Sequence, residues 1–378
     1  MQRVGRELRS YLSRSGDILP PADSATGCRR YESDCSNDIW PEVSESVPSQ
    51  HERNVLMTVH SYLMMESICP QGPRLPLCSG AQRKYVLFAF AVYAVCVVGI
   101  AFPLHADEAD AIAALRQAGF NVKQTAGGTE IGFGPPEWTP DSWQRLSEIT
   151  SLTALRGTAR CADNTGLQVL AKLPRLETLF LNASTFDDDG FATLARIESL
   201  RGLAFDHNQK FSGSGASALK ALPQLRSLRF GGCMKFTGEG VQACVEITQL
   251  ESLQLHHVGI GDDDLPPLAK LPNLKDLFVS SQFNGRLTGT GLKYLAQIRT
   301  LQSLKVAEFV CSYEGGLDAL ARLPGLTKLE LYKVGVSAEN VDKLRKAMPQ
   351  TVIEWTPASD EEIANYHRRA ARWREQSK

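Results

Sequence analysis

Three groups of residues in this sequence have side chains suited to metal binding or acid–base chemistry: Asp187-Asp188-Asp189, Asp262-Asp263-Asp264 and His256-His257. Three consecutive carboxylates could bind calcium, but the ligand spacing of an EF-hand loop is absent. Both triplets lie where helix-periodic segments begin, and there carboxylates satisfy free backbone N–H groups and favour the helix dipole. We therefore predict that the triplets are helix caps and that the protein binds no metal and no cofactor.

The two adjacent histidines are predicted to lie apart. Neighbouring side chains on a strand point to opposite faces of the sheet, so His256 and His257 would not form a ligand pair. The sequence has neither a CxxC nor an HExxH motif, and either would be expected in a typical zinc site. Ordinary surface or loop histidines are therefore the favoured interpretation.

No nucleophile–base pair is recognisable, so we predict that the protein is not an enzyme. The alternative is an enzyme or enzyme subunit that uses residues near 107–148. That segment is only about forty residues long and has no serine–histidine or cysteine–histidine arrangement of the kind nucleophilic catalysis needs.

The composition indicates folded protein with no bias toward anionic partners. The 378 residues carry 41 Lys and Arg against 42 Asp and Glu, a net charge of −1, so no nucleic-acid partner is predicted. A hydrophobic share of 43% argues against disorder over most of the length. Nine cysteines in 378 residues are too few for a disulfide-built scaffold.

The first 106 residues differ from the rest. Residues 1–82 show no sustained apolar period and are predicted to be a disordered or mis-annotated extension. Arg83-Lys84 then precede an uncharged run, Tyr85–Phe102, and Pro103 and Ala106 follow it. This is the pattern of a signal peptide, with a signal anchor as the alternative. Both interpretations place the residues after Ala106 outside the cytoplasm, in the periplasm, in the envelope or secreted, with membrane contact only if 85–102 is retained.

From residue 149 onward the sequence repeats. The repeats begin at spacings of 24, 24, 25, 25, 24, 27 and 25 residues, and a typical one reads Leu173-Pro174-Arg175-Leu176-Glu177-Thr178-Leu179-Phe180-Leu181. The closing L-x-L alternates as a half-buried strand does, and a short helix-periodic segment such as Gly166–Leu173 follows the strand of each repeat. Such a unit cannot close a core alone, but stacked copies can. The eight starts are Ile149, Leu173, Ile197, Leu222, Ile247, Leu271, Ile298 and Leu323.

These L-x-x-L-x-L runs, with turns such as Phe236-Thr237-Gly238-Glu239-Gly240-Val241, resemble leucine-rich repeat proteins of the short bacterial type related to the cysteine-containing subclass. The resemblance covers about 149–347 and implies an α/β solenoid, or horseshoe, with a parallel concave sheet, short convex helices and a cap at each end. The Asn/Cys consensus position is filled only by Asn208 and Cys233, so a continuous asparagine ladder is not expected.

Several expectations follow for the interior and the ends. Phe186, Phe211 and Phe236 should stack in one buried column that Ile260 and Leu287 continue. Cys161, Cys233, Cys244 and Cys311 are expected as free thiols, with a Cys233–Cys244 disulfide left open.

Residues 107–148 form the predicted N-terminal cap, with a hairpin turn at Gly127-Gly128, and residues 348–378 form the C-terminal cap. Ser359-Asp360-Glu361-Glu362 is a capping box that opens the last helix. The apolar face of that helix is expected to cover the last repeat, with a basic tail that contacts an anionic partner or membrane as the alternative.

The residues that alternate with the strand leucines should face the open side of the sheet. We predict that these residues bind a protein or glycan ligand and that the protein is a monomeric, exported binding module. Two alternatives are the enzyme subunit named above and a membrane-anchored architectural protein of the envelope. The ligand's identity and the cleavage of the signal segment stay open. The predicted partner-binding residues are Arg156, Phe180, Asp206, Arg229, Gln254, His256, Phe278, Lys305, Glu330 and Tyr332, with Ala204 also in the row.

Overall fold

The computed structural model describes residues 106–132, 137–280 and 285–376. The chain divides into two compact units, Met1–Ile100 and Ala101–Lys378, and the description below concerns the second. The predicted extension (1–82) and the signal segment up to residue 105 lie outside the described residues, so both stay predictions.

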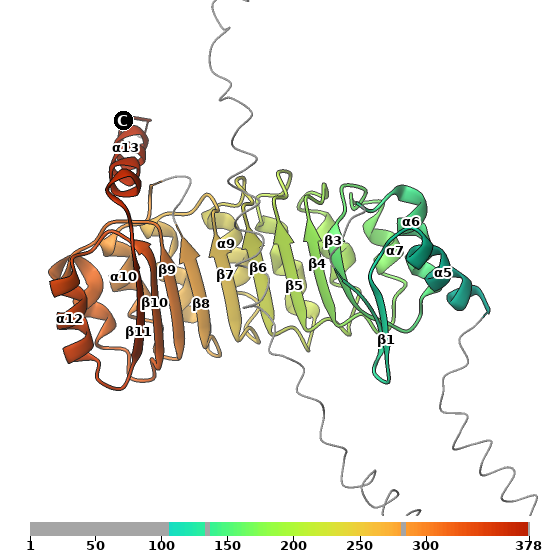
Figure 1. The fold of residues 1–378 in the computed structure, drawn as a ribbon, viewed down its shortest axis with the longest axis horizontal. Helices are drawn as coiled ribbons and strands as arrows, with labels where there is room; N and C mark the ends of the chain where they lie inside the picture. Colours follow the sequence, from blue (N-terminus) through green and yellow to red (C-terminus); the bar gives the residue numbers. More distant parts are fainter. Residues whose placement is uncertain (1–105, 133–136, 281–284, 377–378) are drawn as a thin grey trace, which may run out of the picture. The chain divides into compact units, whose positions relative to one another are not determined.

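Within the described residues, one sheet has its eleven strands in sequence order (Figure 1). The first two strands pair antiparallel, and every later neighbour pairs parallel, as stacked strand–helix repeats require. The strands are β1 (Val122–Thr125), β2 (Gly128–Ile131), β3 (Leu152–Thr158), β4 (Thr178–Asn182), β5 (Gly202–Asp206), β6 (Ser227–Gly231), β7 (Ser252–His256), β8 (Asp276–Ser280), β9 (Ser303–Ala307), β10 (Lys328–Val334) and β11 (Val352–Pro357).

Helices lie on one face of the sheet, and the strands' other face is open (Figure 1). The helical segments of the repeats are shorter than the sequence pattern suggests, and several are 3₁₀ turns, because each repeat leaves few residues between its loop and the next strand. The helical elements are α5 (Ala106–Gln117), α6 (Pro140–Gln144), η1 (Arg145–Glu148), α7 (Leu167–Leu170), α8 (Gly190–Leu194), η2 (Ser214–Ala221), α9 (Gly238–Cys244), η3 (Asp262–Asp264), η4 (Pro266–Lys270), α10 (Gly289–Leu295), η5 (Tyr313–Leu317), α11 (Asp318–Leu320), α12 (Ala338–Ala347) and α13 (Asp360–Gln376).

The leucines of the repeats form the core in the predicted register. Leu179 pairs with Leu203, and Leu203 pairs with Leu228, so equivalent leucines stand side by side on successive strands. All eight residues that begin the repeats are buried. The period-two alternation of each L-x-L therefore does set one face of the sheet against the helices.

Phenylalanines fill the core beneath β4–β6. Phe186 and Phe211 lie 5.3 Å apart between ring centroids, and Phe230 and Phe236 lie 4.5 Å apart, all fully buried. The predicted stacking of Phe186 on Phe211 is confirmed. Phe236 lies against Phe230, whose ring is 5.6 Å from that of Phe211, and Ile260 and Leu287 are buried as predicted.

Asn208 and Cys233 also act as the consensus position suggests. The Asn208 amide donates to the backbone oxygen of Phe186, and the Cys233 thiol donates to that of Phe205. The four cysteines of the described residues are free, so no disulfide joins Cys233 and Cys244.

The acidic triplets do cap backbone N–H groups, both in their own repeat, where the Asp264 carboxylate accepts from the N–H of Gly261 at 2.8 Å, and in the next repeat. The Asp188 carboxylate accepts hydrogen bonds from the N–H groups of Ser212, at 2.8 Å, and Gly215, at 3.0 Å. Asp262 accepts from the N–H of Thr288 at 2.9 Å in the same way. These carboxylates therefore join neighbouring repeats and also satisfy backbone N–H groups that have no partner within the helix.

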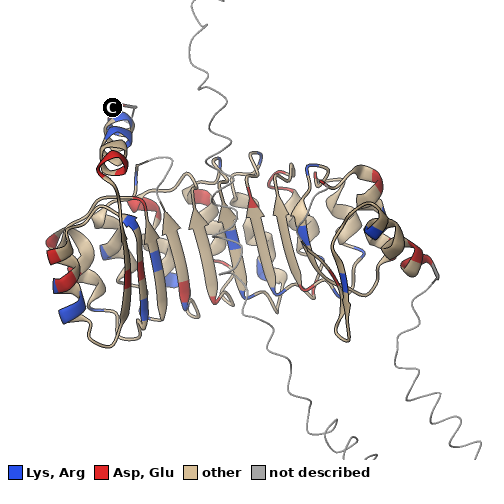
Figure 2. Cartoon of the chain, viewed as in Figure 1, with Lys and Arg blue, Asp and Glu red and all other residues tan. Residues whose placement is uncertain are grey.

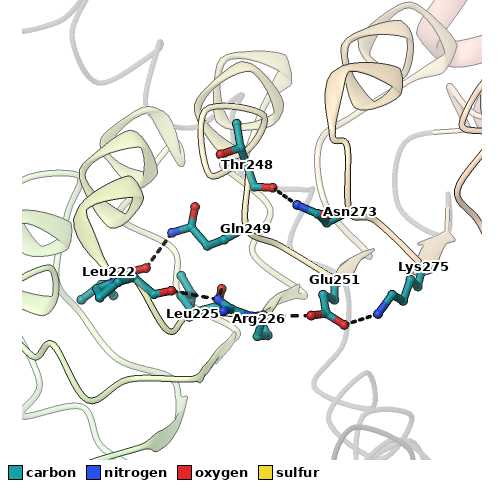
Figure 3. Close-up of polar contacts among 9 residues, drawn as sticks. Leu222, Leu225, Arg226, Thr248, Gln249, Glu251, Asn273 and Lys275 are labelled. Atoms are coloured by element: carbon teal, nitrogen blue, oxygen red, sulfur yellow. Dashed lines mark hydrogen bonds and ion pairs between the residues drawn. The ribbon is translucent and has the colours of Figure 1, made fainter.

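Polar side chains join the repeats at the amino ends of the strands as well (Figure 3). The Glu251 carboxylate lies 3.5 Å from Nε of Arg226 and 2.6 Å from the ammonium of Lys275. The amide of Asn273 donates to the backbone oxygen of Thr248 at 2.9 Å. All of these partners are about one repeat apart, so this edge ties each unit to its neighbour.

The two ends differ in how they meet the sheet. Gly127-Gly128 form the turn between β1 and β2, as predicted. At the other end, Ser359 and Glu362 exchange the two hydrogen bonds of the expected capping box and start α13 directly after β11.

The first turn of α13 contacts the last repeat, where Ile363 lies against Gly335 and Glu362 pairs with Lys333 at 2.9 Å. The helix then passes Gly285, and Trp373 lies 5.2 Å from the Arg286 guanidinium, two repeats earlier. It therefore runs past loops instead of covering the end of the core, with acidic residues at its start and arginines toward its end (Figure 2). Within the described residues, no helix is long and apolar enough to cross a membrane.

Candidate partner-binding face

The predicted open-face residues stand in two rows across the sheet. In the central row, Arg156 pairs with Phe180, and the row continues through Ala204 to Arg229 in direct register. It then passes through Gln254, Phe278, Lys305 and Glu330 without a shift. The second row holds Asp206, Gly231 and His256 on neighbouring strands, and Tyr332 further along.

Charged groups meet in the middle of these rows, over β5–β7. An Nη2 of Arg229 lies 2.6 Å from the carboxylate of Asp206, and 3.4 Å from Nε2 of His256. The guanidinium carbon also lies 5.7 Å from the centre of the Phe180 ring. Since a guanidinium only donates, Nε2 of His256 accepts, and the neutral ring carries its proton on Nδ1.

The same contacts continue toward the C-terminal strands. The rings of His256 and Phe278 stack at 5.2 Å with an interplanar angle of 7°. The Lys305 ammonium lies 5.0 Å from the centre of the Phe278 ring, 5.2 Å from that of Tyr332 and 2.9 Å from the Glu330 carboxylate. Eight of the predicted residues thus form one connected surface, here called the open-face strip: Phe180, Asp206, Arg229, His256, Phe278, Lys305, Glu330 and Tyr332.

The other two predicted residues border the strip. Arg156 is the register neighbour of Phe180, and burial lowers the pKa of its guanidinium while Glu130 opposes that shift. Gln254 stands between Arg229 and Phe278 in the central row and is half-buried.

Half of the strip is far less exposed than an open face implies. Phe180 is 8% exposed, Asp206 9%, Arg229 3% and His256 6%. Phe278, Lys305, Glu330 and Tyr332 are half-buried. These residues stand in the predicted register but are not freely exposed, because long side chains on strands about 4.8 Å apart lie across their neighbours and cover one another.

Burial shifts the two titratable partners of Arg229 in opposite senses. Burial raises the pKa of Asp206, and the charge of Arg229 opposes that shift. Burial lowers the pKa of His256 well below its usual range, and the positive charge of Arg229 lowers it further. His256 is therefore neutral at pH 7, and Arg229 forms its ion pair with Asp206.

Two buried polar atoms in this cluster, Oδ1 of Asp206 and Nδ1 of His256, have no hydrogen-bond partner among the described residues. Each such atom typically costs about 1–3 kcal/mol. An arrangement that keeps this cost is more typical of a functional surface than of one optimised for stability.

The two adjacent histidines do not point to opposite faces. Strand β7 ends at His256, and His257 has a φ of 55°, which turns its ring to within 5.4 Å of the His256 ring. The alternation rule fails because this left-handed residue lies after the strand. Nε2 of His257 lies 2.9 Å from the Glu308 carboxylate, which is buried.

Glu308 and His207 belong to this surface although the sequence did not single them out. Both follow directly after a strand and have positive φ, and Nδ1 of His207 contacts the Asn182 amide oxygen at 2.9 Å. The available signal was the register of Asp206-His207 and His256-His257, which lie 50 residues apart on either side of Gly231-Gly232.

The described residues contain no group of three or more His, Cys, Asp or Glu side chains that could hold a metal ion.

The stacked strands, the short helical segments that follow them in each repeat and the leucine register decide the architecture. The chain has the leucine-rich-repeat fold. No protein-family model matches it, and no curated protein matches it.

Among solved structures, the leucine-rich-repeat chain is similar to an internalin from Listeria monocytogenes, at 18% identity and a TM-score of 0.42, over 69% of this chain and 79% of that one. It is also similar to a TLR13 chain in complex with ssRNA13, at 18% identity and a TM-score of 0.41, over 57% of this chain and 31% of that one. A protein of Bacteroides fragilis has the same identity, 18%, and the same TM-score, 0.41, over 55% of this chain and 66% of that one. Because these scores are low, the fold assignment depends on the repeats and register of this chain itself.

Proposed function

We propose that this protein is a non-catalytic leucine-rich-repeat module that binds a protein partner through the open-face strip. The observation that carries the proposal is the connected surface itself: aromatic rings and ion pairs from strands β4–β10 contact one another across the face opposite the described helices of the repeats. Aromatic residues and arginine concentrate binding energy in interfaces, and a fixed arrangement lowers the entropy lost on binding.

The charges of the strip favour a protein over a nucleic acid. Arg229 is paired with Asp206, and Lys305 is paired with Glu330. A nucleic-acid interface would present cations that phosphates can neutralise. A glycan is the second ligand class, since glycans also stack on aromatic rings, and it is treated as an outcome of the binding experiment.

The proposal includes export and the subclass. Arg83-Lys84 followed by an uncharged run support a signal segment, and detection of Asp107 at the N-terminus of protein outside the cytoplasm would test it. Asn208 and Cys233 support the cysteine-containing subclass. A membrane-anchored architectural protein would differ from this proposal because it needs no ligand. An enzyme subunit would differ because it takes part in a catalytic activity.

Binding is tested with half-buried residues of the strip, because changing fully buried ones would also affect folding. We expect Phe278→Ala and Tyr332→Ala in the full chain each to weaken capture of a partner from envelope or secreted material about tenfold or more. Lys293→Glu on α10 changes an exposed residue of the helical face and serves as the matched control.

Equal capture by the strip variants and the parent would reject the proposal, as would loss of capture by the control alone. Capture of an oligosaccharide without a protein would show that the ligand of the same surface is a glycan.

A further inference from the structure

Two consecutive glycines occupy the end of β6, in the middle of the strip. Gly231 pairs with Asp206 on β5 and with His256 on β7. At this register position the neighbouring strands place Asp206-His207 on one side and His256-His257 on the other. Four titratable side chains therefore flank a pair of residues without side chains.

Space, not backbone conformation, explains the glycine at 231. Its φ is not among the positive values of this chain, whereas Gly232 has a φ of 60°. Glycine in a strand weakens the strand and normally marks a bulge or a close approach by another group. A Cβ on Gly231 would lie 2.3 Å from Oδ1 of Asp206 and 2.5 Å from Nε2 of His256, well inside contact distance.

These two atoms belong to the side chains that hold Arg229. Asp206 reaches its guanidinium from β5 and His256 reaches it from β7, so both lean over β6 from opposite sides. They can meet there only because position 231 has no side chain. The ring of His256, held in this way, in turn stacks on Phe278 and connects the two halves of the strip.

We infer that Gly231 is the specificity-determining position of the open-face strip: its missing side chain lets Asp206 and His256 close on Arg229 and so fixes a surface whose charges are already paired. The inference depends on the proposed function for its consequence, which is that the partner meets this centre with uncharged groups. An acidic or basic partner group would have to compete with an ion pair of 2.6 Å.

The first test is a thermodynamic cycle in the full chain. Both atoms that a Cβ would meet are ends of side chains, so Gly231→Ala should fold and displace them. In the parent, we expect Gly231→Ala to lower the melting temperature of the leucine-rich repeats. In an Asp206→Ala, His256→Ala background, the same change should be neutral or raise it, because alanine suits a strand better and restricts the unfolded chain.

Gly325→Ala is the matched control. A Cβ there would meet Leu301 at 3.4 Å, an ordinary contact, so its effect should be the same in both backgrounds. If Gly231→Ala is equally destabilising in both backgrounds, the glycine serves the backbone and the inference is wrong.

The second test reads the cluster directly, through the pH titration of the His256 imidazole by NMR. The charged or titratable groups that act on it are Arg229, Asp206, His207, His257 and Lys305. In the parent, His256 should stay neutral well below its usual pKa range, and in Gly231→Ala it should titrate closer to that range as the ring leaves the cluster. An unchanged His256 titration in a folded Gly231→Ala protein would overturn the inference.

The binding consequence is tested last, with the captured partner of the preceding section. Its affinity should fall in Gly231→Ala and stay within twofold between low and moderate salt in the parent, since paired charges give little counterion release. A steep salt dependence would reject the uncharged contact while leaving the cycle and the titration intact. Absence of any partner would reject the proposed function and not the role of Gly231 in the cluster.

Discussion

The two faces of strand β6 show how differently one segment can be built. Leu228 and Phe230 point toward the helices and are fully buried among leucines and phenylalanines. Arg229 and the side-chain-free position 231 belong to the open face. There Arg229 is 3% exposed and contacts the carboxylate of Asp206 and the imidazole of His256. Both faces are buried at this point, but one is buried by apolar contacts and the other by paired polar groups.

The comparison teaches that burial on the two faces has different causes. On the inner face, each repeat places apolar residues at equivalent positions, so the core is continuous. On the open face, the side chains differ from strand to strand, and each is fixed by neighbours about 25 residues away in sequence. The inner face should therefore determine stability and the open face should determine recognition.

Removing an inner-face leucine should have the largest effect. Leu228→Ala leaves a cavity in the middle of the stack and typically costs roughly 2–5 kcal/mol of unfolding free energy for such a residue. Because each repeat depends on its neighbours, we expect the loss to spread along the array. Urea titration measures it, and an unchanged midpoint would show that the two faces are assigned the wrong way round.

Removing a charge from the open face should cost less. Asp206→Ala takes away the carboxylate beside Arg229, whose side chain is 4% exposed. Because His256 still contacts that guanidinium, we expect a loss of about 3 kcal/mol, at the low end for a broken buried ion pair. The same urea titration decides the order of the two effects. A cost equal to or greater than that of Leu228→Ala would mean that the strip, too, is primarily a stabilising element.

The third prediction concerns pH. The folded-state pKa of His256 lies below its unfolded value of about 6.5, so only the unfolded chain gains a proton just below that pH. His256 therefore contributes full stability above about pH 6.5, and this contribution is lost as the pH falls from there toward its folded-state pKa.

The raised pKa of Asp206 acts in the opposite sense, because the folded protein then takes up a proton at a higher pH than the unfolded chain. The unfolding free energy, measured at pH 8, 6.5 and 5.5, should fall with acidification in the parent and less so in His256→Gln. His367→Gln, on the exposed side of α13, is the control. Identical pH profiles for His256→Gln and the parent would contradict the buried neutral imidazole.

How much could be predicted depends on which face is considered. The spacing of Leu179, Leu203 and Leu228 was enough to predict the fold, the register and the buried phenylalanine column, because these features repeat. The same register also placed the open-face residues in their rows. It could not show that Asp206 and His256 cover Arg229, because that contact depends on side-chain directions and on the space above Gly231. Nor could strand alternation foresee the positive φ of His257.

The acidic caps should have an intermediate effect. Asp188→Ala removes an acceptor from the N–H groups of Ser212 and Gly215, and the loss of such a cap typically costs about 0.5–2 kcal/mol. Burial raises the pKa of Asp188, but the hydrogen bonds from those groups together outweigh it, so the pKa is lowered. Asp189→Ala changes a neighbouring exposed carboxylate without these two bonds and is the control. Equal effects of the two changes, measured as melting temperatures, would show that the capping contact is unimportant.

The smallest effect is expected at the amino ends of the strands, where Glu251 joins Arg226 and Lys275. These side chains are 39–46% exposed, so water and salt screen the ion pairs, and exposed pairs contribute roughly 0.2–1 kcal/mol each at most. We expect Glu251→Gln to lower the melting temperature slightly at low ionic strength and not at all in high salt, since screening removes the attraction. The Arg229–Asp206 pair on the same sheet is buried, so the cost of Asp206→Ala should persist in high salt. If instead both costs vanish in high salt, the Arg229–Asp206 pair is no better protected from solvent than the Glu251 pairs. The two polar regions would then differ only in the distances between their charged atoms.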